Sequence, residues 1–220
     1  MKILLNGKKA LVGGSSSGIG RAIAMELAAC GASVTLMARS EDKLKVVLAE
    51  LNTDQGQEHS YLVSDFNDYG AHKENLKRFF EDYTIDILVN NTNGPQAGDV
   101  LHKEEADYQQ AFDLLFQNAV FASRLALPHM QSQGFGRIIN VSSMTVKEPQ
   151  DSLVLSNTMR TALVSWSKSL SNAVATDGIT VNSIMTGYFD TDRLNSLMEN
   201  QAKSAGVDVA DVRKQRISAV

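Results

Sequence analysis

A glycine-rich turn, Gly14-Ser-Ser-Ser-Gly18-Ile-Gly20, lies near the start of the chain. It follows an apolar stretch, residues 9–13, that is typical of a short buried strand, and it leads directly into an amphipathic helical pattern. The N-terminus of a helix offers unpaired N–H groups and the positive end of the helix dipole, and glycines let a phosphate approach the backbone. A purely structural turn is the alternative. We predict a phosphate-binding site formed by Gly14, Ser16, Ser17, Gly18, Ile19 and Gly20.

Polar side chains follow the next apolar stretches as well. In an open α/β sheet, ligands bind outside the carboxyl ends of the strands, where the strand order reverses. Residues at these positions are therefore candidates for ligand binding. For Arg39 the alternative is a solvated charge, and for Asp65 it is the N-cap of a helix. The candidates are Arg39, Asp65, Phe66, Asn90 and Asn91.

The apolar stretches alternate with amphipathic helical patterns along the chain. This alternation predicts an α/β fold with a doubly wound parallel sheet in three layers, and residues 1–220 are expected to form a single domain. Pro128 is expected to kink the longest helix or to end its regular part. Residues 190–220 are polar and helical in pattern. The predicted strands are residues 9–13, 32–38, 61–64, 85–90, 137–141 and 179–185, and the helices after the first are residues 41–51, 75–83, 104–133 and 153–176.

The composition narrows the class of protein. Of the 220 residues, 43% are hydrophobic and 21% are charged, which is ordinary for a globular protein. The net charge of −4 gives no general attraction to nucleic acid or to an anionic membrane, so neither is an expected partner. No stretch approaches the roughly 18 apolar residues of a membrane span. Cys30 is the only cysteine and the histidines are far apart in sequence, so we expect no metal site and a reducing, cytoplasmic location.

Four motifs carry a resemblance to a known family. The chain resembles the short-chain dehydrogenase/reductase superfamily over nearly its whole length, and within it the 3-oxoacyl carrier-protein reductases. The family motif T-G-x-x-x-G-x-G corresponds to residues 13–20, and Asn-Asn-Ala-Gly corresponds to Asn90-Asn91-Thr92-Asn93-Gly94, with Asn93 where the family has glycine. Asp65 matches the residue that meets the adenine. The resemblance implies a Rossmann-type fold, and it assigns the region near the nicotinamide to Gly187, Phe189 and Thr191.

The catalytic positions of the family are only partly matched. Ser143 corresponds to the catalytic serine, but Ser156 stands thirteen residues later where the family has tyrosine, and Arg160 stands four further on where it has lysine. Leu115 occupies the position of the relay asparagine. A serine hydroxyl is less acidic than a phenol, and an arginine cannot exchange protons, so the resemblance implies an atypical proton donor. Tyr188 is a possible replacement phenol, with packing over the cofactor or substrate as the alternative.

The second predicted strand ends without an acidic residue and is followed by Arg39. An acid at this position suits the ribose hydroxyl of NAD, whereas a guanidinium suits the 2′-phosphate of NADP. We therefore expect NADP(H), with NAD(H) as the alternative. The expected activity is hydride transfer between the nicotinamide and a small-molecule carbonyl or alcohol. The alternative is a non-catalytic dinucleotide-binding protein that acts as a sensor, a scaffold or a partner subunit.

The family normally forms dimers or tetramers through two long helices, which correspond here to residues 104–133 and 153–176. By this resemblance, the chain is expected to form a homodimer or a homotetramer. The last strand of the family is not recognisable before Val220. Either the sequence is trimmed to a part of the protein, or the protein ends early, and the second case would leave an open sheet edge at the sixth strand.

Overall fold

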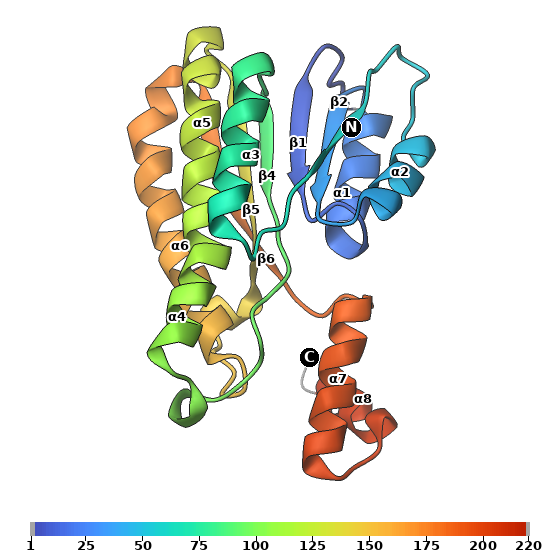
Figure 1. Cartoon of the computed structure of the whole chain (residues 1–220), viewed down its shortest axis with the longest axis vertical. Coiled ribbons are helices and arrows are strands. Elements are labelled where there is room, and N and C mark those ends of the chain that lie inside the picture. Colours follow the sequence, from blue (N-terminus) through green and yellow to red (C-terminus); the bar gives the residue numbers. More distant parts are fainter. Residues whose placement is uncertain (1–2, 219–220) are drawn as a thin grey trace. The chain divides into compact units, whose positions relative to one another are not determined.

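A computed structural model describes residues 3–218 of the chain (Figure 1). The chain divides into two compact units, one up to Thr186 and one from Gly187 onward. The first unit contains the sheet, and the second contains two helices. Assignment of residues 187–220 to the same domain as the sheet stays a prediction.

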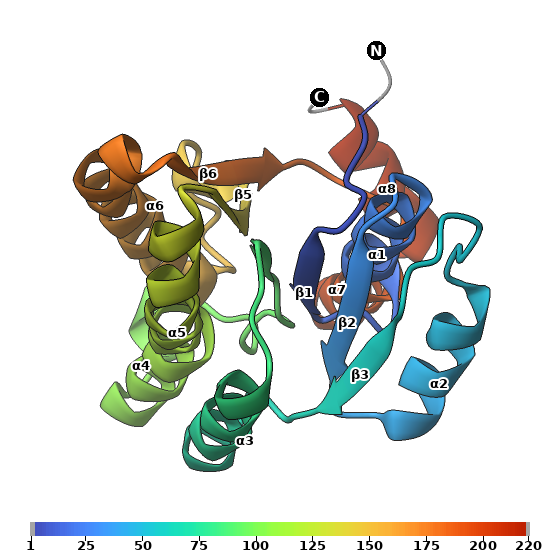
Figure 2. The ribbon, with the colours of Figure 1, turned by 90° about the horizontal axis from the view of Figure 1, so that it is seen from above.

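The first unit is built on one sheet of six parallel strands in the order β3-β2-β1-β4-β5-β6 (Figures 1 and 2). The order reverses between β1 and β4, so the switch point lies at their carboxyl ends. The prediction of a doubly wound, Rossmann-type parallel sheet is thereby confirmed. The strands are β1 (Lys9–Gly13), β2 (Ser33–Ala38), β3 (Ser60–Val63), β4 (Ile87–Asn90), β5 (Gly136–Ser143) and β6 (Ile179–Thr186).

Helices lie on both faces of the sheet and bury most of its alternating side chains, while one face of β6 is exposed. Leu11 of β1 packs with one hydrophobic cluster, and its neighbours Ala10 and Val12 pack with the other, as the two-residue period of a strand requires. Figure 2 shows α1 and α2 on one side of the sheet and α3, α5 and α6 on the other. The bounds of these helices are α1 (Gly18–Ala29), α2 (Glu41–Glu50), α3 (Tyr69–Asp82), α4 (Glu105–Phe112), α5 (Asn118–Gln133) and α6 (Val154–Val174).

The longest predicted helix, residues 104–133, is broken in a different place from the one expected. A π-helical turn, Asp113–Gln117, separates α4 from α5. Helix α5 contains Pro128 in its interior and continues to Gln133, where Gly134 ends it with a positive φ of 60°. Of the two outcomes expected at Pro128, an end of the helix is therefore wrong, and a kink stays a prediction. Single π turns of this kind occur frequently at functional sites.

Helix α3 begins six residues earlier than predicted. Its N-cap is Asp68, whose carboxylate accepts a hydrogen bond from the backbone N–H of Ala71 at 2.9 Å. The carboxylate of Asp65 instead accepts from the backbone N–H of Asn67 at 3.0 Å. The alternative interpretation of Asp65 as the helix cap is thus wrong, and Asp65 belongs to the turn between β3 and α3.

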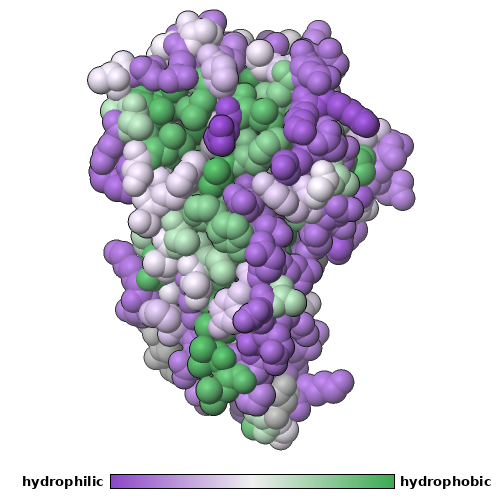
Figure 3. Space-filling view, turned by 60° about the vertical axis from the view of Figure 1, so that its left-hand side comes forward, coloured by the Kyte–Doolittle hydropathy of each residue, from purple (hydrophilic) through white to green (hydrophobic). Residues whose placement is uncertain are grey.

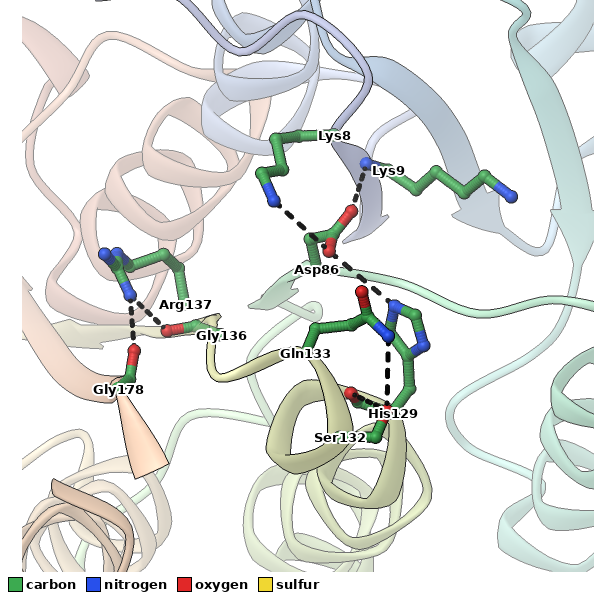
Figure 4. A network of polar contacts seen from close by, with 9 residues as sticks. All are labelled: Lys8, Lys9, Asp86, His129, Ser132, Gln133, Gly136, Arg137 and Gly178. Carbon is green, nitrogen blue, oxygen red and sulfur yellow. Dashed lines mark hydrogen bonds and ion pairs between the residues drawn. The ribbon is translucent and has the colours of Figure 1, made fainter. Parts of the chain in front are cut away.

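A buried carboxylate ties the amino-terminal end of the sheet to α5 (Figure 4). Asp86 precedes β4 and is 7% exposed. It accepts a hydrogen bond from the backbone N–H of Lys9 at 2.9 Å, and it pairs with Lys8 Nζ at 3.7 Å and with His129 Nε2 at 3.6 Å. This contact fixes β1, β4 and α5 at the end of the sheet opposite the ligand-binding edge.

The second unit is a pair of helices, α7 (Asp192–Ala205) and α8 (Val209–Ser218), as the polar helical pattern predicts. They share a small buried cluster of Met198, Ala202 and Val212. Across residues 3–218, no helix is long and apolar enough to cross a membrane.

Candidate active site

The glycine turn lies between the ends of β1, β2 and β4. Gly14 and Gly18 have φ values of +57° and +54°, which favour glycine. A Cβ added to Gly13 would lie 2.5 Å from the backbone oxygen of Asn91, so this segment packs directly against the loop after β4. The side-chain amide of Asn91 donates to the carbonyl of Gly13 at 3.0 Å, which holds the two loops together. Asn91 therefore supports the turn.

Ser15 fixes the turn from the side of β2. It is fully buried, and its hydroxyl accepts a hydrogen bond from the backbone N–H of Met37 at 2.8 Å. Its own N–H donates to the carbonyl of Met37 at 3.4 Å. Our sequence analysis selected the neighbouring serines and missed this one, because burial of a serine inside a serine-glycine run leaves no signal in the sequence.

The N-terminus of α1 is open to an anion. Its N-cap residue, Ser17, makes no side-chain capping bond, and the first turn contains no acidic residue. Ser17 and Gly18 are exposed and Ser16 is half-buried. Uncapped N–H groups beside glycines can bind a phosphate, as the sequence predicts for this turn.

The adenine side of the predicted cofactor site is formed by the ends of β2 and β3. Arg39 follows β2 and is exposed. Hydrogen bonds from the backbone and the side chain of Asn67 lower the pKa of Asp65, and the positive charge of Arg39 adds to this effect. Phe66 is 7% exposed, and its carbonyl accepts a hydrogen bond from the side chain of Asn118. An anionic Asp65 and a cationic Arg39 therefore face the same region.

Asn90 lies at the end of β4, but its side chain belongs to a buried polar network. Its amide donates to Asn140 Oδ1 at 2.8 Å and to Ser123 Oγ at 3.2 Å. The Asn140 amide donates in turn to Ser167 Oγ at 2.8 Å. The network joins β4 and β5 to α5 and α6, so Asn90 supports the carboxyl edge of the sheet.

Two hydroxyl groups of the predicted catalytic set are held so that their own protons can be donated. At the end of β5, Ser143 Oγ accepts from Thr145 N at 3.2 Å and from Thr145 Oγ1 at 3.1 Å. On α6, Ser156 Oγ accepts from Arg160 Nε at 3.1 Å. Because both serine oxygens act as acceptors here, each hydroxyl proton is available to another oxygen.

Arg160 connects α6 to the sheet edge. Its Nη1 donates to the carbonyl of Val141 at 2.7 Å, while its Nε donates to Ser156. These contacts place the guanidinium between the two serine-bearing elements. A fixed positive charge beside Ser156 favours the ionised form of that hydroxyl.

A pocket opens at the carboxyl edge of β1 and β4. One part of its lining comes from Asn91 and Arg160, and another from Leu115 and Asn118 of the broken helix. Leu115 is 3% exposed and lies in the π turn, so an apolar side chain occupies the position where the resemblance places the relay asparagine. The pocket also extends to the buried His72.

The remaining predicted site residues lie in the second unit. They are Gly187, Tyr188, Phe189 and Thr191, of which Tyr188 is 37% and Phe189 is 55% exposed. Thr191 is the N-cap of α7, and its hydroxyl accepts from the N–H of Leu194 at 3.3 Å. The roles of these residues toward a cofactor stay predictions.

Comparison with known proteins identifies the family. The family described as short chain dehydrogenase matches residues 8–202. The chain belongs to this family. It is 34% identical to the 3-oxoacyl-[acyl-carrier-protein] reductase FabG of Haemophilus influenzae, over 90% of this chain and 80% of that protein. It is also 30% identical to the uncharacterized oxidoreductase YvrD of Bacillus subtilis, over 94% of this chain and 78% of that protein.

Solved structures of other family members have the same fold. The L-sorbose reductase of Gluconobacter frateurii, complexed with NADPH and L-sorbose, superposes with a TM-score of 0.85 at 29% identity, over 96% of this chain and 81% of that one. A 3-oxoacyl (acyl-carrier-protein) reductase of Agrobacterium tumefaciens with NADP bound gives a TM-score of 0.82 at 26% identity, over 91% and 78% of the two chains. The chain is thus an oxidoreductase-family protein with the fold that binds nicotinamide dinucleotides.

Proposed function

We propose that the protein is an NADP(H)-dependent reductase of small-molecule carbonyl compounds, with an atypical proton donor. The observation that carries the proposal is the uncapped N-terminus of α1, held in place by the contacts of Gly13 and Ser15 with the loops around it. A pyrophosphate fits such a site because the N–H groups and the helix dipole both favour negative charge. The backbone of Gly18 and Ile19 and the hydroxyl groups of Ser16 and Ser17 would hold it.

The preference for NADP(H) rests on Arg39. Its exposed guanidinium follows β2, where a dinucleotide ribose lies in this fold, and it can bind a 2′-phosphate through charged hydrogen bonds. The neighbours complexed with NADPH or NADP support this choice. Asp65 and Phe66 would contact the adenine, and Asn91 would support the ribose region.

Reduction needs a hydride and a proton. When bound, the reduced nicotinamide supplies the hydride. We assign polarisation of the substrate oxygen to Ser143, whose proton is available, and proton donation to Ser156. Arg160 does not exchange its own proton, and its charge would stabilise the alkoxide that forms on Ser156 until water reprotonates it. Ser156 thus takes the place of the family tyrosine, and Arg160 that of the lysine.

The alternative donor is Tyr188, which lies in the second unit with Gly187, Phe189 and Thr191. Substitution of Tyr188 by Phe would abolish turnover and leave NADPH affinity unchanged if the phenol were the donor. Unchanged turnover would remove Tyr188 from the mechanism and leave Ser156 as the candidate.

A homodimer or homotetramer is also proposed. Figure 3 shows apolar side chains between polar ones on the side of the first unit where α5 and α6 lie. Phe116 of the π turn and Trp166 of α6 are half-buried, with their rings 6.3 Å apart edge to face. Burial of such aromatic groups between two subunits would stabilise association.

Cofactor binding is tested by calorimetric titration of the protein with NADPH and NADH. We expect NADPH to bind at least tenfold more tightly than NADH. In the Arg39→Ala variant, NADPH affinity should fall about tenfold, the loss of one charged hydrogen-bonding group, with NADH affinity unchanged. Equal affinities of the natural protein for the two dinucleotides would contradict the assignment of Arg39.

A non-catalytic dinucleotide-binding protein is the second candidate. The specific observations in its favour are Leu115 in the π turn and the serine hydroxyl where the family has a phenol. It predicts tight NADPH binding without turnover of any carbonyl compound.

A further inference from the structure

Asn118 has an amide whose orientation is fixed by its partners. It is 3% exposed, and its Nδ2 donates to the carbonyl of Phe66 at 2.9 Å and to that of Leu114 at 3.2 Å. Only the nitrogen end of the amide can face two carbonyl oxygens, so Oδ1 must point the other way. Asn118 Oδ1 is buried and has no hydrogen-bond partner among the described residues. The orientation of the Asn118 side chain is therefore set by the two hydrogen bonds that its Nδ2 donates.

These bonds connect two functional segments that are far apart in sequence. Leu114 belongs to the π turn, which the backbone N–H of Asn118 helps to close by donating to Asp113. Phe66 lies in the turn after β3 beside Asp65, where the adenine is proposed to bind. One side chain thus links the adenine side of the site to the turn that carries Leu115.

His72 holds the same turn from α3. It is 1% exposed, its Nδ1 lies 2.8 Å from Ser64 Oγ, and its ring centroid lies 4.9 Å from that of Phe66. Asn75 Nδ2 also donates to Ser64 Oγ at 3.4 Å, so Ser64 joins His72 and Asn75 of α3 to the end of β3. Burial lowers the pKa of His72 to about 4, which keeps the ring neutral at physiological pH.

We propose that Asn118 and His72 are positioning residues that hold the Asp65–Phe66 turn in the shape that binds the adenosine half of the dinucleotide. Asn118 acts through the carbonyl of Phe66, and His72 acts through Ser64 and the Phe66 ring. Both side chains are almost fully buried, so we assign them a role through this turn and not a direct contact with the cofactor. This inference rests on the proposed binding of NADP(H).

The test separates cofactor affinity from stability. Asn118→Leu removes both donor bonds at nearly constant volume. We expect its dissociation constants for NADPH and for adenosine 2′,5′-bisphosphate to rise by the same factor, about tenfold, because only the adenosine half is affected. The matched control is Asn157→Leu on α6, another buried asparagine that donates one amide bond, to Gln150 O at 2.8 Å. It should lower thermal stability and leave both dissociation constants unchanged.

Equal affinity of wild type and a folded Asn118→Leu variant for both ligands would overturn the positioning role. If Asn118→Leu does not fold, Asn118→Ser and His72→Gln replace it, and each is expected to weaken both ligands at least threefold. If the wild-type protein binds neither ligand, the cofactor proposal itself fails and the positioning role with it. Weaker binding of NADPH with unchanged binding of the bisphosphate would also contradict the inference.

Discussion

The buried polar groups at the two ends of the sheet differ in their hydrogen-bond partners. At the amino-terminal end, Asp86 is bound by the N–H of Lys9 and by the side chains of Lys8 and His129 (Figure 4). At the carboxyl-terminal end, Asn118 Oδ1 and Ser142 Oγ are buried without a partner among the described residues. Burial of an unsatisfied polar group costs roughly 1–3 kcal/mol. The carboxyl-terminal end thus has, beside the hydrogen-bonded Asn90 network, buried polar atoms for which the described residues supply no partner.

The two ends of β1 also differ in how their glycines are packed. Gly7, before β1, has a positive φ of 74° and no atom near the position of an added Cβ. Gly13, at the other end of the same strand, packs against the backbone of Asn91. A side chain at Gly7 would strain only its own backbone, whereas one at Gly13 would displace the loop after β4. For β1, close approach to another backbone thus occurs at the ligand-binding edge, while Gly178, before β6, makes a similar approach to Gly134 at the other end of the sheet.

The largest effect is expected from Gly13→Ala. The new Cβ would push the glycine turn away from Asn91 and move the N–H groups of α1, so NADPH affinity measured by calorimetry should fall at least about 100-fold, roughly 2.7 kcal/mol. Gly7→Ala is the control, with stability lowered by about 1 kcal/mol and NADPH affinity unchanged. Equal loss of affinity in both variants would contradict the difference between the two ends.

Ser156→Ala is expected to lower kcat about 100-fold and to leave the dissociation constant of NADPH unchanged, because a proton donor contributes to the chemical step. Ser165→Ala, an exposed serine on the same helix, serves as the control. Steady-state kinetics with a carbonyl substrate provides the measurement. Full activity of Ser156→Ala would exclude this hydroxyl as the donor.

His72, near the carboxyl-terminal end of the sheet, should make the free energy of unfolding fall in acid. His72 has a pKa of about 4 when folded, against 6.5 for an unperturbed histidine, so the unfolded chain binds more protons between these values. Stability should therefore fall by about 3 kcal/mol as the pH drops from about 6.5 to about 4. Urea unfolding at several pH values tests this. In the His72→Gln variant, the free energy of unfolding should change less over this pH range. An unchanged pH dependence would assign the loss of stability in acid to other groups.

At the amino-terminal end, Asp86→Ala should lower the free energy of unfolding by about 2 kcal/mol, because the Lys9 N–H loses its buried acceptor. Asp86→Asn keeps an acceptor oxygen and should lose less. NADPH affinity should stay unchanged in both variants, and Asp82→Ala, an exposed carboxylate of α3, is the neutral control. A loss of NADPH affinity in Asp86→Ala would show that the two ends are coupled.

The sheet could be predicted from the sequence because each strand is a compact apolar stretch next to an amphipathic helix. All six strands lie within two residues of their predicted bounds at either end. The start of α3 and the π turn could not be predicted. Both depend on hydrogen bonds of particular side chains, Asp68 to Ala71 and Asn118 to Leu114, that periodicity does not encode.

Sequence motifs predict the residues of the candidate site, and these assignments stay predictions; the motifs do not reveal the residues that support them. Glycines and serines at strand ends indicated a phosphate site, since these residue types have specific backbone chemistry. Ser15, His72 and Asn118 gave no such signal, because their importance comes from burial between elements that only the fold brings together. Asn118 lies three residues after Leu115, so helical spacing was the one clue to a shared position.

The most direct test of the central claim is NADPH oxidation by the natural protein at high concentration against a panel of carbonyl compounds. The Ser156→Tyr, Arg160→Lys double variant is assayed beside it. We predict turnover of at least one compound by the natural protein, with Ser156 as donor. Tight NADPH binding without turnover by the natural protein, together with activity in the double variant, would contradict the claim and identify a cofactor site without catalysis.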